Sequence, residues 1–146
     1  AVATDGSTDS TATITQQLYA EFGAHLRTTR EILTNSINSS GYNRYGSASG
    51  CSNSWTWQSC QAVLMSEVEC YGSTVWSSSG FDTGNANRQL PLFAFSKQAQ
   101  NNRSAWYWFK DIASSAYFCT STHLGYSSYD SASLASCFVR PRFVIA

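Results

Sequence analysis

Two long polar segments interrupt this chain and limit it to short elements of secondary structure. Residues 38–54 and 77–89 are rich in Gly, Ser and Asn, and apolar residues show no regular spacing in either. Loops of this length are uncommon in compact domains, and those that occur are usually functional or are packed by their own side chains. The sequence therefore predicts short helices and strands joined by long ordered loops.

Helical spacing of apolar residues is confined to the N-terminal part of the chain. Residues 1–13 are small and polar, and we interpret them as a flexible lead-in. After them, apolar residues recur at helical intervals, at Ile14, Leu18, Phe22, Leu26, Leu33 and Ile37. This spacing predicts a helix that breaks at Gly23 or in the RTTR segment that follows. Ser66, with Glu69 three positions later, is typical of a capping box and predicts a second, short helix.

Most other apolar residues form short runs that predict β-strands. We expect strands at 55–65, 90–95, 104–113 and 138–146, and two further strands within 117–129 around a turn at Gly125. Pro91 favours a sheet edge or a strand start for the run at 90–95. A chain of 146 residues is long enough for one domain with a real core. We therefore expect residues 14–146 to form a single α+β domain with mixed or antiparallel strands.

The composition is typical of a folded protein with a contact surface. The formal net charge is zero, only 12% of residues are charged, and 14% are aromatic. Disordered chains show the opposite balance, whereas abundant Tyr, Trp, Ser, Gly and Asn are typical of binding surfaces. The basic residues are scattered and no apolar run is long enough to span a bilayer. We therefore expect no nucleic-acid partner and no membrane insertion.

The cysteines do not suggest a complete disulfide framework. Their number is odd and they have no close pairs, at Cys51, Cys60, Cys70, Cys119 and Cys137. Buried free thiols are the favoured interpretation. A Cys51–Cys60 bridge is the first exception to test.

Five segments together resemble one group of phage and prophage proteins. They are FGAHLRTTREILTNS, SWTWQSCQAVLMSEVECYGSTVWSSSGFDTG, RQLPLFAF, WYWFKDIASSAYF and VRPRFVI, which extend from Phe22 to Ile145. The group comprises the variable proteins of diversity-generating retroelements, which have a C-type lectin-like fold. The chain departs from the family pattern at Trp108–Lys110, where the family usually has W-L-R, and at Phe138, where a glycine is common.

The resemblance implies a C-type lectin-like domain with a hypervariable ligand surface near its C-terminus. In such systems an error-prone reverse transcriptase rewrites adenines, mostly in AAY codons, which then cannot encode Lys, Glu, Gln, Met or Trp. Residues 117–138 contain none of these five types and no Asn. The expected function is attachment to a host cell-surface protein or glycan from the virion surface. Other tail or fibre proteins would be partners, and homo-oligomerisation is an open possibility. A structural virion-decoration domain and a conventional carbohydrate-binding module are the alternatives.

The candidate ligand contacts lie mainly on the predicted C-terminal strands. They are Tyr117, Thr120, Thr122, His123, Leu124, Tyr126, Ser128, Asp130 and Leu134. The two-residue period of a strand places Tyr126, Ser128 and Asp130 on one face and Tyr129 on the other, so Tyr129 is either scaffold or contact. Trp106 and Tyr107 would border the surface. We assign Trp108 to the core.

The remaining polar residues favour structural roles. Arg140 and Arg142 are expected to bind backbone carbonyls or buried acids such as Glu67 or Asp82. The sequence has no nucleophile elbow, phosphate loop, zinc spacing or tight carboxylate pair, so we expect no enzymatic activity and no cofactor. A structural Ca²⁺ ion in the oxygen-rich loop at 81–87 is left as an open alternative.

Overall fold

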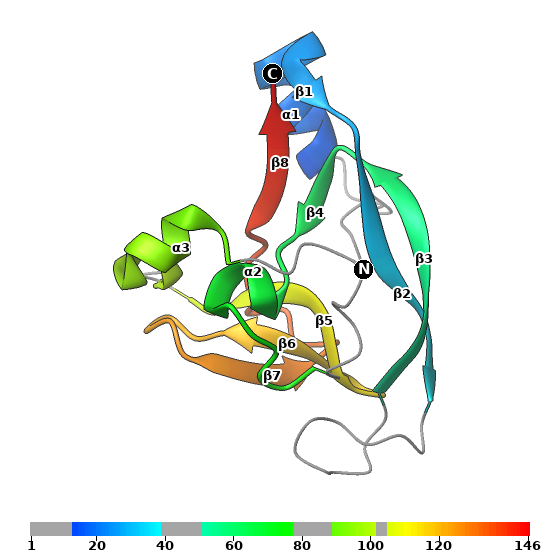
Figure 1. Cartoon of the computed structure of the whole chain (residues 1–146), viewed down its shortest axis with the longest axis vertical. Helices are drawn as coiled ribbons and strands as arrows, with labels where there is room; N and C mark the ends of the chain where they lie inside the picture. The colour runs from blue at the N-terminus through cyan, green and yellow to red at the C-terminus, as the bar shows by residue number, and fades with distance from the viewer. Residues whose placement is uncertain (1–12, 39–50, 78–88, 102–104) are drawn as a thin grey trace.

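The protein has a mixed α+β fold with short, mostly antiparallel strands and few helices (Figure 1). The computed structural model describes residues 13–38, 51–77, 89–101 and 105–146. The strands form three small sheets, two of three strands and one of two. None of the helices in the described ranges has the length and apolar character needed to cross a bilayer.

One end of the molecule is built from helix α1 and the sheet β1-β8-β4. Helix α1 (Ile14–Phe22) starts with a capping box between Thr13 and Gln16. Strand β8 (Pro141–Ile145) lies between β1 (Leu26–Arg27) and β4 (Ala62–Leu64) and is antiparallel to both. The rings of Phe22 and Phe143 join the helix to this sheet, with centroids 5.4 Å apart.

The expected helix is shorter than its apolar spacing suggests. It ends at Phe22, because Gly23 follows with a φ of 55°, which is outside the helical region. After the 3₁₀ turn η1 (Gly23–His25), the chain forms β2 (Thr29–Asn38). Threonine and isoleucine are frequent in this segment, and their branched Cβ favours a strand.

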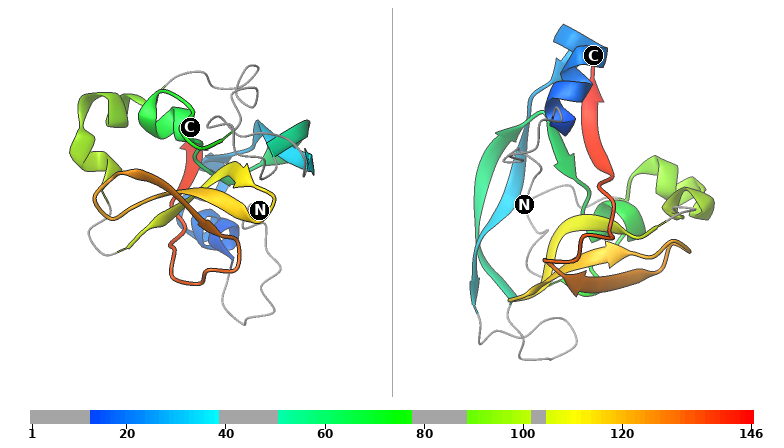
Figure 2. Two further views of the ribbon diagram at one scale, coloured as in Figure 1. Left: turned by 90° about the horizontal axis from the view of Figure 1, so that it is seen from below. Right: turned by 180° about the vertical axis from the view of Figure 1, so that it is seen from behind.

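Strands β2 and β3 (Cys51–Cys60) form a long antiparallel ribbon along one side of the molecule (Figure 2). The expected strand at 55–65 is therefore two strands, β3 and β4, separated at Gln61. The Cys51–Cys60 disulfide, which was the exception to test, does not form. These residues lie at opposite ends of β3, opposite Asn38 and Thr29 respectively, and Cys60 is a free thiol.

The third sheet has the order β5-β6-β7, from β5 (Tyr107–Ser114), β6 (Tyr117–Ser121) and β7 (Ser127–Ser131). The two strands expected within 117–129 are present. Phe138 forms a parallel bridge with Tyr107 at the outer edge of β5, so the chain passes this sheet again before it enters β8.

Two short helices lie beside this sheet. Helix α2 (Glu67–Tyr71) begins with the expected capping box of Ser66 and Glu69. The segment expected to be a strand at 90–95 is instead helix α3 (Pro91–Phe95), followed by the 3₁₀ turn η2 (Lys97–Gln100). Pro91 occupies the first turn of α3, where a missing N–H costs nothing.

The core lies between α2, α3 and the sheet β5-β6-β7. Its buried members are Met65, Cys70, Phe93, Tyr107, Phe109, Ala113 and Cys119. The rings of Tyr107 and Phe109 meet edge to face at 5.5 Å, a favoured aromatic geometry. This core fixes β5 and β6, and it therefore determines where the last hairpin of the chain is displayed.

Candidate ligand-binding surface

The hairpin of β6, β7 and their connection, residues 117–131, projects at the end of the molecule opposite α1 (Figures 1 and 2). Its turn is where the sequence predicts it. Gly125 has a φ of 80°, and its N–H donates to the carbonyl of Thr122 at 2.9 Å. The Thr122 hydroxyl accepts from the N–H of Tyr126 at 3.0 Å. A Cβ on Gly125 would lie 2.5 Å from Oδ1 of Asn101, so the turn packs against the end of η2.

One face of the hairpin is directed toward α2. The strand register places Tyr117, Cys119 and Ser121 of β6 on this face, opposite Ser131, Tyr129 and Ser127 of β7. Cys119 and Ser121 are buried, and the Ser121 hydroxyl accepts from Tyr71 of the α2 helix at 2.8 Å. The inner part of this face is therefore an anchor, while its outer part reaches solvent.

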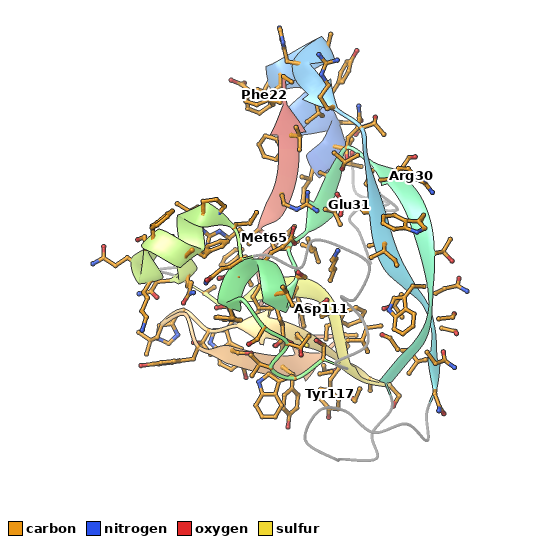
Figure 3. All side chains as sticks on the ribbon, in the orientation of Figure 1. Phe22, Arg30, Glu31, Met65, Asp111 and Tyr117 are labelled. Carbon is orange, nitrogen blue, oxygen red and sulfur yellow. The ribbon has the colours of Figure 1, made fainter. Side chains whose placement is uncertain are left out.

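The expected contacts at the hairpin tip and outer end are exposed. Tyr126 is 67% exposed and Leu124 is 56% exposed. His123, Leu134 and Tyr117 are exposed as well, Tyr117 at 41%. Figure 3 shows Tyr117 at the outer end of the sheet. These five residues are the part of the expected contact set that a ligand can reach most easily.

Other expected contacts are covered to different degrees. Thr120 is completely buried, because it lies in the central strand of its sheet between Trp108 and Ser128. Tyr107 is also completely buried, and its hydroxyl donates to the carbonyl of Gln100 at 2.8 Å. We therefore remove both from the candidate surface. Four further residues are only half-buried, namely Trp106, Thr122, Ser128 and Asp130.

The assignment of Trp108 to the core also needs correction. Trp108 is half-buried, on the face of the sheet directed away from α2. Its ring meets that of Phe118 edge to face at 6.4 Å. Trp108 therefore packs against Phe118 of β6 but remains partly accessible to solvent.

The pattern of exposure places Tyr129 among the candidate contacts. It is 44% exposed, although it lies on the face opposite Ser128 and Asp130. Its ring is 5.6 Å from Tyr117 and 4.8 Å from Trp76, edge to face in both cases. Tyr117, Tyr129 and Trp76 therefore form a continuous line of rings, which we call the aromatic row. Trp76 comes from outside the hairpin, and no sequence pattern places it there.

A buried carboxylate joins the hairpin to α2 and to residues 75–77. Glu67 is fully buried, and its carboxylate accepts from the backbone N–H groups of Val75, Trp76 and Ser77 at 3.0–3.2 Å. The Ser77 hydroxyl donates to it as well, at 2.9 Å. Ser127 of β7 donates to Oε1, also at 2.9 Å. Buried acids need such compensation, and here it fixes three segments relative to one another.

The two arginines of the last segment have structural partners, as expected. Arg140 donates to the carbonyl of Ala99 at 2.7 Å, and its guanidinium lies over the rings of Phe93 and Tyr107. Arg142 forms ion pairs with Glu31 at 2.6 Å and Glu69 at 2.7 Å. Figure 3 places Glu31 on the inner side of the ribbon. The acids paired with Arg142 among the described residues are thus Glu31 and Glu69 rather than Glu67, and Asp82 lies outside the described residues.

The described residues contain no group of three or more His, Cys, Asp or Glu side chains arranged to hold a metal ion. The loop at 81–87, the alternative place for Ca²⁺, lies outside the described residues.

Burial raises the pKa of the Cys137 thiol to about 11, with a further contribution from Asp130. The thiol therefore stays protonated at neutral pH and is a weak nucleophile.

Comparison of this chain with protein-family models, curated proteins and solved structures found no match.

Proposed function

We propose that this protein is the ligand-binding domain of a phage or prophage variable protein, with a C-type lectin-like fold and a hypervariable hairpin surface. On this proposal the domain attaches the virion to a host cell-surface protein or glycan and catalyses no reaction. The sequence resemblance provides the family. The α+β architecture with mostly antiparallel strands is compatible with it.

One observation carries the proposal. The hairpin has a buried inner part and an outer rim of large exposed side chains, which include Tyr117, Leu124, Tyr126 and Tyr129. Exposed aromatic residues on a firmly held backbone are typical of binding hot spots, because their ordering costs little entropy. Asp130 is the one formally charged residue between Ile112 and Val139. Binding should therefore depend on shape and apolar contact more than on charge.

The genetic part of the proposal is tested in the DNA around the gene. We expect a reverse transcriptase gene nearby and a near-repeat of the codons for residues 104–143. At the positions where the near-repeat differs from the gene itself, the near-repeat should contain adenines. A complete genome that lacks both elements would refute the retroelement origin.

The binding part is tested with Tyr126→Ala, measured as adsorption of particles carrying the domain to cells of the host identified from that genome. We expect at least a tenfold loss of adsorption, because exposed aromatic side chains often dominate a binding surface. The circular dichroism spectrum should not change, because the Tyr126 side chain is 67% exposed. Trp57→Ala is the matched control, since Trp57 is 46% exposed on the distant ribbon. Equal adsorption by both variants would contradict a ligand surface on the hairpin and favour a decoration role.

A further inference from the structure

The aromatic row combines residues from two separate parts of the chain. Tyr117 and Tyr129 belong to the hairpin, whereas Trp76 follows helix α2. The ring planes of successive members are inclined at 86° and 66°, so each ring packs its edge against the next. Edge-to-face packing of this kind is a favoured aromatic geometry. Tyr117 and Tyr129 are exposed and Trp76 is half-buried, so the row is a partly exposed apolar strip.

Trp76 is held more firmly than an ordinary loop residue. Its backbone N–H lies 3.1–3.2 Å from both oxygens of Glu67, and the N–H groups on either side bind the same carboxylate. The indole ring also packs against the buried core cluster. The ring is therefore oriented before any ligand arrives, which lowers the entropic cost of contact.

Glu67 also controls the other side of the row. Its Oε1 accepts from Ser127, which lies two residues before Tyr129 on β7. The same carboxylate therefore sets the positions of Trp76 and of the strand that carries Tyr129. A change at Glu67 would alter the distance between the rings of Trp76 and Tyr129. Glu67 itself is fully buried and lies out of reach of a ligand.

We propose that Trp76 is a constant ligand-contacting residue of the hairpin surface and that Glu67 is the positioning residue for it. This inference rests on the proposed function. The ligand surface then has two parts, a rim of exchangeable hairpin side chains and an aromatic ring supplied by a different segment. Trp is one of the residue types enriched at binding hot spots, and a ring that is already oriented loses less entropy when it binds.

The test is a selection against a defined target. A display library randomised at Tyr117, His123, Leu124, Tyr126 and Leu134, with Trp76 and Tyr129 unchanged, is selected for binding to purified lysozyme. Trp76→Ala is then introduced into several independent binders, and the Kd of each is measured by surface plasmon resonance. We expect at least a tenfold weaker Kd, and a change below twofold for the control Trp57→Ala.

Glu67 is tested in the same binders with two substitutions. Glu67→Ala should weaken binding as Trp76→Ala does, because it releases residues 75–77 and Ser127 together. Glu67→Gln should restore most of the affinity. Its amide oxygen can still accept from the N–H groups of 75–77, and its amide NH₂ can donate to the Ser127 hydroxyl, which accepts as readily as it donates.

A spectroscopic measurement covers the case in which Trp76→Ala does not fold. Wild-type binders labelled with 5-fluorotryptophan are titrated with lysozyme, and the ¹⁹F resonance of Trp76 is assigned from the Trp76→Phe variant. We expect this resonance to shift at saturation while that of Trp57 stays in place. An unshifted Trp76 resonance, or unchanged affinity of folded Trp76→Ala binders, overturns the inference.

The outcomes separate this inference from the proposed function. If binders arise and lose affinity on alanine substitution at the randomised positions, the hairpin is a ligand surface whatever Trp76 does. If no binder arises, or if alanine at all five positions is tolerated, the proposed function fails and the inference fails with it.

Discussion

Removal of Arg142 should be among the most destabilising single substitutions in this protein. Its guanidinium lies 2.6 Å from Glu31 and 2.7 Å from Glu69, and both carboxylates are buried. Arg142→Ala leaves Glu69 without this cation and Glu31 with Lys110, whose Nζ is 3.9 Å away. Truncating one partner of a buried ion pair typically costs about 3–5 kcal/mol.

The lower part of that range applies here, because the Arg142 side chain is 18% exposed and water can reach the ion pairs. We expect the free energy of unfolding to fall by about 3 kcal/mol. For a domain of this size that corresponds to a fall in Tm of roughly 6–12 °C. The measurement is urea denaturation followed by tryptophan fluorescence, with a calorimetric scan of the same samples.

Two further variants identify the cause. Arg27→Ala is the matched control, because Arg27 is an exposed arginine of β1, and it should change stability by less than about 0.5 kcal/mol. The double variant Arg142→Met, Glu69→Gln removes the acid that would lose its cation, while Glu31 keeps its ion pair with Lys110, so it should recover more than half of the loss. A loss below about 1 kcal/mol for Arg142→Ala, or no recovery in the double variant, would refute this reasoning.

Two other predictions concern the turn of the hairpin and the buried thiol and phenols. Gly125→Ala should destabilise the domain more than Gly72→Ala in thermal melts, although both glycines have a φ of 80°. A new Cβ at position 125 would lie 2.5 Å from Oδ1 of Asn101 and 3.1 Å from Cβ of Gln100, whereas at position 72 the nearest atom belongs to the Gln89 side chain at 3.4 Å. Equal losses would show that the tip does not pack on η2. Burial raises the pKa of Cys70 from 9.0 to about 11 and also raises the pKa of Tyr71 and Tyr107. These groups hold their protons more tightly when folded, so their contribution to the free energy of unfolding should be fully present below pH 9 and should be lost as the pH rises above it. Cys70→Ala should reduce the decrease in stability between pH 9 and 11, and an unchanged decrease in that range would contradict its origin.

Local rules predicted the features that neighbouring residues decide. The capping box of Ser66 and Glu69 needs only a four-residue pattern, and the turn at Gly125 needs only a residue that accepts positive φ. Both are present where expected. The structural roles of Arg140 and Arg142 also followed from sequence, although the particular acids did not, because Glu31 is brought to Arg142 only by the tertiary fold.

The failures occurred where distant parts of the chain decide. Residues 29–38 have helical spacing of apolar side chains but pair with β3, since tertiary contacts outweigh weak local preference. The short apolar run at 90–95 fits a strand or a helix equally well, and Pro91 suited the first turn of α3. Thr120 was expected at the surface because alternation along β6 does not reveal which positions neighbouring strands cover. Trp76 was missed because only the fold brings it to Tyr129.

The division of the hairpin into buried and exposed positions has an evolutionary consequence. Cys119, Thr120 and Ser121 are fixed by packing, so most replacements there would bring the domain below the stability it needs. Replacements at Leu124 or Tyr126 leave that packing intact. Heritable change can therefore accumulate on the rim almost independently of folding, and successive generations can sample new surfaces while the backbone that displays them stays the same.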